Sequence, residues 1–413
     1  MPEAVSKKYR LAYLVTHPIQ YQAPLLRLIG HDPDIHLKVF FASTFSAGTY
    51  DDPEFGQAIA WDVPVLEGYA HEVLPALPGT RYPGDRYFDA WRPFSVGLRR
   101  RLLAGRFDAL WIHGYARVPH LWAMIAARSA GVRVMLRDET NGLGRSTGGA
   151  KRAIKRGLFA LLNRCVDGYL TVGTMNERHY RELGIDPGKF FRVGYAVDNA
   201  WFQARIAESL PLLPSLRSEL GLAEGQHTIL YAAKLIPRKA PLDLIQAFAR
   251  ALSAMPPNQR PVLLIAGDGE LRPQAEAAIA ALDLAHAVRL LGFQSQQQLA
   301  ALYALCDLFV LPSAHETWGL VVNEVMNAGK AVIASDRVGA AYDLIRDGTN
   351  GAIYPFGDID ALACRLCEAL ADPVRLAAMG AESRRLIGAW DFAQNLAGLK
   401  AALAAVTNPA PCA

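Results

Sequence analysis

The sequence has few cysteines, no long apolar run and no strong excess of charge. Only five of its 413 residues are cysteine, and they are scattered, which argues against a disulfide framework. Its apolar runs fall well short of the roughly 20 residues that a membrane-spanning helix needs. The net charge is only +4, and no stacking aromatics accompany the basic segments, so no nucleic-acid partner is expected.

Metal ligands in a recognisable pattern are also scarce. Cys364 and Cys367 form a Cys-x-x-Cys pair, but no second pair or His-x3-His accompanies them, and we interpret them as two small buried residues of a helix. Asp358 and Asp360 have the Asp-x-Asp form of metal-dependent transferases, yet they begin a helical pattern, where Asp358 is expected to act as the cap. We therefore expect neither a metal nor another cofactor.

The N-terminal apolar stretch, Leu11–Val15, superficially resembles a signal peptide. It is short, and His17-Pro18 follows it without a small-residue cleavage site, so a first buried strand is the better interpretation. A cytoplasmic location is expected.

The chain is 52% hydrophobic and long enough for two domains of about 200 residues each. Short apolar runs alternate with longer helical patterns, which is typical of parallel sheets with crossover helices, and so of an α/β fold with two doubly wound Rossmann-like domains facing each other across a cleft. Strands are expected at Leu11–Val15, Leu37–Phe41, Ala109–Ile112, Val132–Leu136, Gly168–Val172, Thr228–Tyr231, Val262–Ala266, Val288–Leu291, Leu308–Leu311, Ala331–Ala334 and Gly351–Tyr354.

The domain boundary is expected within Phe202–Ser218, a segment that contains Pro211 and Pro214. This divides the chain into an N-terminal Rossmann-like domain (1–202), a C-terminal Rossmann-like domain (203–388) and a C-terminal helix (389–413), which is a candidate to cross back onto the first domain. Residues 1–200 carry 26 Lys and Arg against 19 Asp and Glu. The positive excess therefore lies in the first half, where an anionic surface or acceptor would bind.

The segment between Asp307 and Glu324 carries the strongest functional signal. A buried strand ends at Leu311, and a helix is expected to begin near Trp318, capped by Thr317. The N–H groups at such a helix start favour phosphate, and a glycine lets a ligand approach the backbone closely. Two carboxylates of the segment can accept hydrogen bonds from sugar and ribose hydroxyls. The expected contacts of this segment are Glu316, Thr317, Trp318, Gly319, Leu320 and Glu324.

Three further loops follow strands at the same edge of the second sheet. Lys234 and Lys239 supply cations that suit a diphosphate, while Gly267 and Gly269 make a small-residue loop. Phe293 and Gln294 could read a base edge. Taken singly, each of these loops is also what an ordinary connection between a strand and a helix looks like. Glu316 alone could be a turn residue, and Glu324 alone could be a solvated helix residue. Four such loops at one edge favour a nucleotide-sugar site.

With these motifs, the second half resembles the nucleotide-binding domain of retaining GT-B glycosyltransferases of family 4, the glycosyl transferases group 1. The resemblance covers about 228–370, with Glu316 and Glu324 as its most specific motif. It implies that Lys234 and Lys239 hold the pyrophosphate, that Glu324 binds ribose, and that Glu316 with the 317–320 amides holds the sugar and its phosphate. The family usually has Gly-Arg in place of Ala233-Lys234 and Phe in place of Trp318.

The first half resembles the family more loosely. His17 and Tyr21 lie in a bulky loop where the family often has a glycine-rich one, and both are acceptor-side candidates. The resemblance implies that His113, after the strand ending at Ile112, reaches the donor sugar; the alternative is a histidine hydrogen-bonded within the cleft wall. With Glu316 and Lys239, His113 completes the expected catalytic set. Three residues after the next strand are acceptor-side candidates, or else a structural ion pair: Arg137, Asp138 and Glu139.

The expected function is transfer of a sugar from a UDP- or GDP-sugar to an unknown acceptor hydroxyl with retention, without metal, in bacterial glycan, polysaccharide or glycolipid biosynthesis. Rival interpretations are a GT-B-type nucleotide-sugar epimerase or hydrolase, and a non-catalytic membrane-associated partner of polysaccharide assembly. Two basic segments, 99–101 and 150–162, are candidates for contact with an anionic membrane, the second as an amphipathic helix. Such helices also occur simply packed on a core with a solvated charged face.

Overall fold

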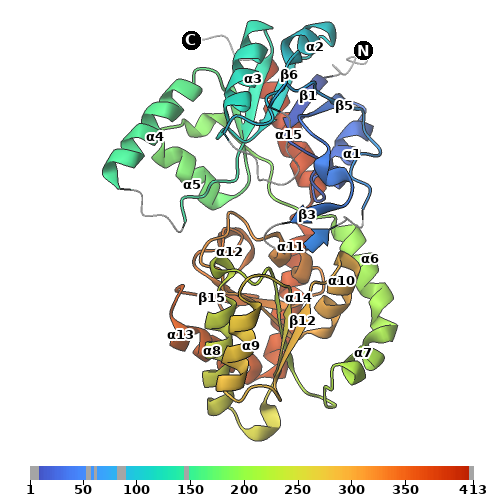
Figure 1. The fold of residues 1–413 in the computed structure, drawn as a ribbon, viewed down its shortest axis with the longest axis vertical. Coiled ribbons are helices and arrows are strands. Elements are labelled where there is room, and N and C mark those ends of the chain that lie inside the picture. Colours follow the sequence, from blue (N-terminus) through green and yellow to red (C-terminus); the bar gives the residue numbers. More distant parts are fainter. Residues whose placement is uncertain (1–8, 53–56, 60–62, 81–89, 144–147, 409–413) are drawn as a thin grey trace, which may run out of the picture.

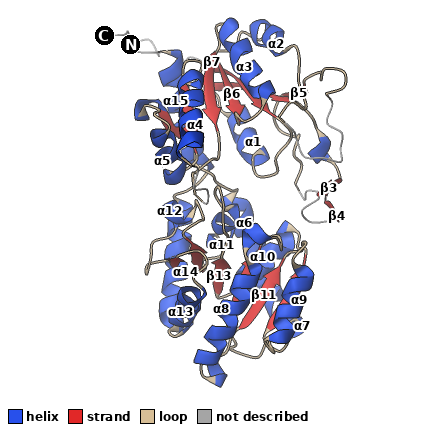
Figure 2. Cartoon of the chain, turned by 60° about the vertical axis from the view of Figure 1, so that its left-hand side comes forward, coloured by secondary structure: helices blue, strands red, loops and turns tan. Residues whose placement is uncertain are grey.

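The computed structural model describes residues 9–52, 57–59, 63–80, 90–143 and 148–408. Two α/β lobes lie one above the other along the long axis of the molecule (Figure 1). Each lobe is built on a parallel sheet with helices packed against it (Figure 2). The fold class expected from the alternation of strands and helices is thus confirmed.

The N-terminal sheet has the strand order β5-β2-β1-β6-β7-β8-β9, and all its neighbours are parallel. Its strands are β1 (Tyr9–Val15), β2 (Ile35–Phe41), β5 (His71–Val73), β6 (Ala109–His113), β7 (Arg133–Arg137), β8 (Gly168–Thr171) and β9 (Phe190–Arg192). β3 (Tyr50–Asp52) and β4 (Gln57–Ile59) form a separate antiparallel pair. The helices are α1 (Ala23–His31), α2 (Leu98–Ala104), α3 (Val118–Ser129), α4 (Gly149–Leu162) and α5 (Thr174–Glu182).

The C-terminal sheet has the order β12-β11-β10-β13-β14-β15, again all parallel. Its strands are β10 (Thr228–Ala232), β11 (Val262–Ala266), β12 (Val288–Gly292), β13 (Leu308–Leu311), β14 (Ala331–Ser335) and β15 (Gly351–Tyr354). The helices of this domain are α6 (Asn199–Ser209), α7 (Leu213–Glu219), α8 (Pro241–Ala254), α9 (Arg272–Ala281), α10 (Gln296–Leu305), α11 (Leu320–Met326), α12 (Ala341–Leu344), α13 (Ile359–Leu370) and α14 (Pro373–Gly388). The chain then continues into α15 (Phe392–Thr407). Short 3-10 turns lie at Phe45–Ala47, Pro187–Lys189, Leu210–Leu212, Pro237–Lys239 and Pro257–Gln259.

The central strands are buried on both faces. Every residue of β10, β11, β13 and β14 is buried. This explains why the sequences of these strands are continuous apolar runs and do not alternate between apolar and polar residues. Every strand expected from the sequence is present within one or two residues, whereas β5, β9 and the β3–β4 pair were not anticipated.

Both sheets reverse their strand order beside their first strand, between β1 and β6 and between β10 and β13. Such points leave a crevice at the carboxyl ends of the strands, where ligands of open α/β sheets bind. The loops that follow β1, β7, β10, β11, β12 and β13 line one shared cleft, so the two crevices face each other.

Two helices cross the boundary expected from the sequence. The expected division after residue 202 falls inside α6, whose Phe202 and Ile206 belong to the core of the C-terminal domain. The last helix, α15, was a candidate from the sequence to cross back, and it lies in the N-terminal lobe, as its red ribbon shows in Figure 1. There its Leu399, Leu403 and Val406 complete the core beneath β1, β2 and β8.

Several local expectations can now be compared with the structure. Ser295 forms the expected capping box with Gln298, and Asp358 caps α13 by accepting from Ala361 N. The prediction that Thr317 caps a helix starting near Trp318 is wrong, because α11 begins at Leu320 and its cap position is Gly319.

The prediction for the cysteine pair is wrong in part, because Cys364 is exposed and Cys367 is half-buried on α13. Among the described residues, no three His, Cys, Asp or Glu side chains gather as a metal-binding group. No helix in the described ranges is long and apolar enough to span a bilayer.

Candidate functional site

An open cleft of about 510 Å³ lies between the two domains, within the usual size range of small-molecule sites. Four residues of the N-terminal part line it: Gln20, Tyr21, Glu139 and Tyr195. The C-terminal domain contributes eleven of the expected donor contacts: Lys234, Lys239, Gly267, Phe293, Gln294, Glu316, Thr317, Trp318, Gly319, Leu320 and Glu324. Gly269 is not among the lining residues.

Glu316 and Lys239 form a close ion pair on the wall of this cleft. The side chains of Glu316 and Lys239 are only 8% and 16% exposed. Ser313 Oγ donates to Glu316 Oε1 at 3.1 Å, and the guanidinium of Arg238 lies 3.7 Å from the other carboxylate oxygen. An anion entering the cleft can therefore compete with Glu316 for two cations at once.

Glu324 projects from α11 into the same cleft. Tyr303 of α10 donates a 2.7 Å hydrogen bond to Glu324 Oε2. Burial raises the pKa of Glu324, and the Tyr303 hydrogen bond opposes that shift by favouring the charged form. Glu324 is thus a half-buried, oriented acceptor and not a freely solvated helix residue.

The turn between Glu316 and α11 presents backbone donors to the cleft. Gly319 has φ +100°, in the left-handed region that favours glycine. The N–H groups of residues 317–320 donate to no acceptor within the part of the chain that the structure describes. Trp318 offers little surface to the cleft, because the residue is only 3% exposed and its ring packs between Tyr195 and Trp390.

The two glycines after β11 have a structural reason of their own. A Cβ on Gly267 would lie 2.0 Å from the carbonyl oxygen of Ala233, and one on Gly269 would lie 2.6 Å from that of Leu235. Gly267 also has φ +143°. Both glycines therefore let this loop pack against the lysine-bearing loop after β10, which fixes the position of Lys234.

The expected base-reading loop after β12 lies at another part of the cleft. Gln294 is held by a 2.9 Å hydrogen bond from its Nε2 to Leu291 O, while Phe293 is 38% exposed. An exposed aromatic ring beside a fixed amide can stack with and orient a planar base.

His113 lies behind the N-terminal wall and is not a lining residue of the cleft. Its Nε2 lies 3.2 Å from Glu139 Oε1, and its Nδ1 lies 3.1 Å from Gln22 Nε2. The Tyr195 hydroxyl donates to the same Glu139 oxygen. The structure therefore places Glu139, and not His113, at the surface of the cleft. The contacts of His113 are those of the alternative considered from the sequence, a histidine hydrogen-bonded within the cleft wall.

The remaining acceptor-side candidates lie away from the cleft surface. Arg137 is buried and donates to the carbonyls of Val193 at 2.7 Å and Gly194 at 3.3 Å. Asp138 accepts from Thr140 N in a local turn, and burial raises the pKa of its carboxyl group. The alternative considered from the sequence, an ion pair of Arg137 with Asp138 or Glu139, is not found among the described contacts, because the guanidinium donates to the backbone that follows β9.

His17 is likewise not a lining residue of the cleft. It lies 4.8 Å from the ring of Phe45 and 2.9 Å from Thr16 Oγ1, measured from its Nδ1. Burial lowers the pKa of His17 to about 3, so it is neutral at physiological pH. An acceptor contact by His17 would require that side chain to move.

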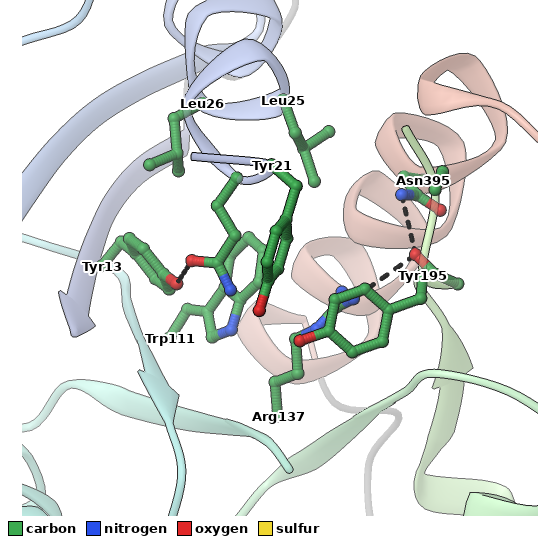
Figure 3. A pocket seen from close by; sticks show the side chains of 11 residues that line it. Tyr13, Tyr21, Leu25, Leu26, Trp111, Arg137, Tyr195 and Asn395 are labelled. Carbon is green, nitrogen blue, oxygen red and sulfur yellow. Dashed lines mark hydrogen bonds between the residues drawn. The ribbon is translucent and has the colours of Figure 1, made fainter. Parts of the chain in front are cut away.

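Arg137 lines a small pocket that shares two residues with the cleft (Figure 3). The volume of this pocket is about 10 Å³, room for roughly one water. Tyr21 and Tyr195 line both this pocket and the cleft, and their rings meet edge to face at 5.6 Å. The Arg137 guanidinium lies 5.0 Å from the Tyr195 ring centroid, so a buried cation supports the aromatic wall from behind.

Sequence reasoning missed the residues that join the two halves of the site. Tyr195 follows β9 in an extended segment without a motif, and Asn141 follows the acidic cluster. Asn141 Nδ2 donates to the carbonyls of Glu316 at 2.7 Å and Thr317 at 3.0 Å. Asn141 and Tyr195 contact residues more than 120 positions away in the sequence, so no local sequence pattern could have identified them.

Comparison with known proteins agrees with this geometry. Residues 214–386 match the family model described as glycosyl transferases group 1. A D-inositol 3-phosphate glycosyltransferase of Nocardia farcinica is 33% identical over 187 residues, which cover 44% of this chain and 41% of that protein. A GDP-mannose-dependent monoacylated alpha-(1-6)-phosphatidylinositol monomannoside mannosyltransferase of Corynebacterium glutamicum is 32% identical over 184 residues, 43% of this chain and 46% of that protein. The match thus spans less than half the length of these curated relatives.

Solved structures resemble the chain over nearly its whole length. A glycosyltransferase from Rickettsia africae aligns with a TM-score of 0.71 and 14% identity, covering 98% of this chain and 100% of that one. HepE of Anabaena in complex with UDP aligns with a TM-score of 0.69 and 19% identity, covering 96% and 100%. At such identities the likeness concerns the fold. The chain therefore has the GT-B fold, and its residues 214–386 match the model of the glycosyl transferases group 1 family.

Proposed function

We propose that the protein transfers a sugar from a UDP- or GDP-sugar to an acceptor hydroxyl with retained configuration, in the assembly of a bacterial glycan, polysaccharide or glycolipid. The observation that carries the proposal is the meeting of Lys234, Lys239, Glu316 and Glu324 around one cleft of about 510 Å³. The family match of this domain and the names of its relatives support it.

The proposed chemistry follows from the charges on the cleft wall. The donor diphosphate displaces Glu316 from Lys239 and is held by Lys234, Lys239 and the N–H groups of residues 317–320. Glu316, once released, accepts a hydrogen bond from a sugar hydroxyl, while Glu324 accepts from the ribose. The bond between the anomeric carbon and the diphosphate oxygen breaks with its electron pair on the diphosphate. The acceptor oxygen bonds to the anomeric carbon, and its proton passes to the departing diphosphate.

We further propose that this chemistry needs no metal. Two lysines of the lining, with Arg238 beside them, supply the positive charge that a divalent ion would otherwise provide. Donor consumption should therefore persist in excess EDTA.

The donor site is tested by nucleotide binding and donor consumption. Wild type should show a rise in melting temperature with UDP, GDP or their sugars, since a ligand that binds only the folded state stabilises it. Glu316→Ala and Lys239→Ala should each reduce donor consumption strongly, and His113→Ala should reduce it through the placement of Glu139. Near-normal turnover in all three variants would refute the assignment. Donor loss that is independent of any acceptor would favour the epimerase or hydrolase interpretation.

We also propose that α4 rests on an anionic membrane surface. Ile154, Leu158 and Leu161 form one stripe along α4 and are 73%, 39% and 59% exposed. The helix also carries exposed Lys151, Arg152 and Arg156. Exposed apolar residues together with clustered cations on one helix suit a headgroup layer that contains anionic lipid.

Vesicle flotation tests this surface. The protein should bind vesicles containing phosphatidylglycerol and not vesicles of phosphatidylcholine alone, and Leu161→Asp should abolish binding. Leu212→Asp is the matched control, because Leu212 is 62% exposed on the other domain. Equal loss in both variants, or unchanged binding of Leu161→Asp, would contradict the proposal.

A further inference from the structure

The turn of residues 316–319, the donor turn, is held by a side chain of the other domain. Asn141 lies in the loop that follows β7 and is 3% exposed. Its Nδ2 donates to Glu316 O at 2.7 Å and to Thr317 O at 3.0 Å, and its Oδ1 accepts from Leu143 N at 3.0 Å. A backbone N–H can only donate and a carbonyl can only accept, so these partners fix which end of the amide faces the donor turn.

The loop that carries Asn141 is itself held in place by a second asparagine. Asn176 of α5 is 1% exposed, and its Nδ2 donates to the carbonyls of Asp138 at 3.0 Å and Thr140 at 2.8 Å. Its Oδ1 accepts from Val172 N at 3.2 Å. The donor turn is therefore tied to the N-terminal domain through two buried amides in series.

The carbonyl of Thr317 depends on Asn141 more than that of Glu316 does. Glu316 O also accepts from Gly339 N at 3.3 Å, whereas Asn141 is the one donor to Thr317 O within the ranges that the structure describes. A Cβ on Gly339 would lie 2.2 Å from Thr317 O, so the glycine leaves this carbonyl the room to reach Asn141. Without the Asn141 amide, the peptide unit that follows Thr317 would lose the contact that sets its orientation.

These bonds set the direction of two peptide N–H groups. The peptide units that join residues 316 to 317 and 317 to 318 are trans, and in a trans unit the C=O and N–H point in opposite directions. Since both carbonyls are directed at Asn141, the N–H groups of Thr317 and Trp318 point to the opposite side of the turn. Both residues line the cleft, and neither N–H donates to an acceptor among the described residues.

From this geometry we infer that Asn141 is a positioning residue for the donor, although it lies in the other domain and is not a lining residue of the cleft. By holding the carbonyls of Glu316 and Thr317, it directs the N–H groups of Thr317 and Trp318 at the terminal phosphate of the nucleotide. These N–H groups adjoin Glu316 and lie away from Glu324, which is proposed to hold the ribose, so they are at the end of the turn where the phosphate that carries the sugar would lie. The inference rests on the proposed transferase function. It makes tight binding of the diphosphate depend on the N-terminal domain.

The test compares nucleotides with and without the terminal phosphate. UDP and UMP, and likewise GDP and GMP, are titrated calorimetrically into wild type and Asn141→Ser. A serine hydroxyl can still accept from Leu143 N, which keeps the local turn, but it is too short to reach both carbonyls of the donor turn. Asn141→Ser should weaken the affinity for the diphosphate about 5- to 20-fold, as expected for the loss of two neutral hydrogen bonds, and the affinity for the monophosphate less than about 2-fold.

A matched control removes the same kind of amide elsewhere in the C-terminal domain. Asn350 is fully buried, donates from Nδ2 to Leu344 O at 2.9 Å and accepts from Arg346 N at 2.7 Å. It is not a lining residue of the cleft. In Asn350→Ser the ratio of diphosphate to monophosphate affinity should therefore equal that of wild type.

A second variant acts on the same contact from the other side. In Gly339→Ala the new Cβ pushes Thr317 O away from Asn141, so the ratio of affinities should fall as it does in Asn141→Ser, and this variant carries the test if Asn141→Ser does not fold.

The outcomes separate the inference from the proposed function. Equal weakening of diphosphate and monophosphate binding in Asn141→Ser would mean a merely structural role and would overturn the inference. Unchanged binding of both nucleotides by Asn141→Ser, or a lowered ratio in Asn350→Ser, would overturn it as well. Failure of wild type to bind any of the four nucleotides would refute the proposed function instead.

Discussion

The ion pair between Lys239 and Glu316 makes a prediction that links stability to donor binding. Lys239→Met leaves the Glu316 carboxylate on the cleft wall with Ser313 as its closest donor and Arg238 at 3.7 Å. Breaking a buried pair by removing one partner costs about 3–5 kcal/mol, and the partial exposure of Lys239 reduces this to about 2 kcal/mol. For a domain of this size, that corresponds to a fall in melting temperature of about 4–8 °C.

A double-mutant cycle measures the coupling directly. Glu316→Gln keeps the shape of the side chain and removes its charge, so the double variant Lys239→Met/Glu316→Gln should be about as stable as Glu316→Gln alone. The coupling energy, obtained from urea unfolding, should be about 2 kcal/mol. Additive effects within about 0.5 kcal/mol would show that the pair does not form in solution and would refute the reasoning.

The same variants should separate binding from catalysis. In Glu316→Gln, Lys239 no longer has to leave a carboxylate before it meets the diphosphate, so the affinity for UDP or GDP should rise while sugar transfer falls. In Lys239→Met, both affinity and transfer should fall. Isothermal titration with the free nucleoside diphosphates measures this, and weaker nucleotide binding by Glu316→Gln would contradict the proposed exchange of partners.

Three further predictions follow from other parts of the structure. Gly267→Ala should destabilise the C-terminal domain and abolish nucleotide binding, because its Cβ would lie 2.0 Å from Ala233 O, whereas Gly149→Ala, which meets nothing within 4 Å, should leave the melting temperature unchanged or higher. Asp343 joins the domains through Thr174 and Arg192, so Asp343→Ala should loosen their arrangement and increase the radius of gyration in solution scattering. Burial lowers the pKa of His120 to about 3, so the unfolded chain binds a proton below pH 6.5 that the folded chain does not, and stability should fall as the pH drops from 7 to 4. That fall should be smaller in His120→Asn.

The amino-acid sequence alone determined the α/β class, most strands of both sheets and the loops that line the C-terminal side of the cleft. Buried parallel strands are continuous apolar runs, and the loops that follow them meet at one sheet edge whatever the packing of the helices. Lys234, Lys239, Glu316 and Glu324 could therefore be assigned to one site from local patterns. The sequence analysis placed the start of α11 near Trp318, two residues before its actual start at Leu320, because the cap position is Gly319, which has no side chain to signal it.

The tertiary structure decided everything that depends on contacts between distant segments. It placed His113 behind Glu139, turned Arg137 away from the cleft toward the carbonyls of Val193 and Gly194, and paired Lys239 with Glu316. It also returned α15 to the core of the N-terminal domain. Such pairings depend on how the two domains and the crossing helix pack against each other. A periodic pattern along one segment shows only which face of that segment is buried, so it cannot predict the partner.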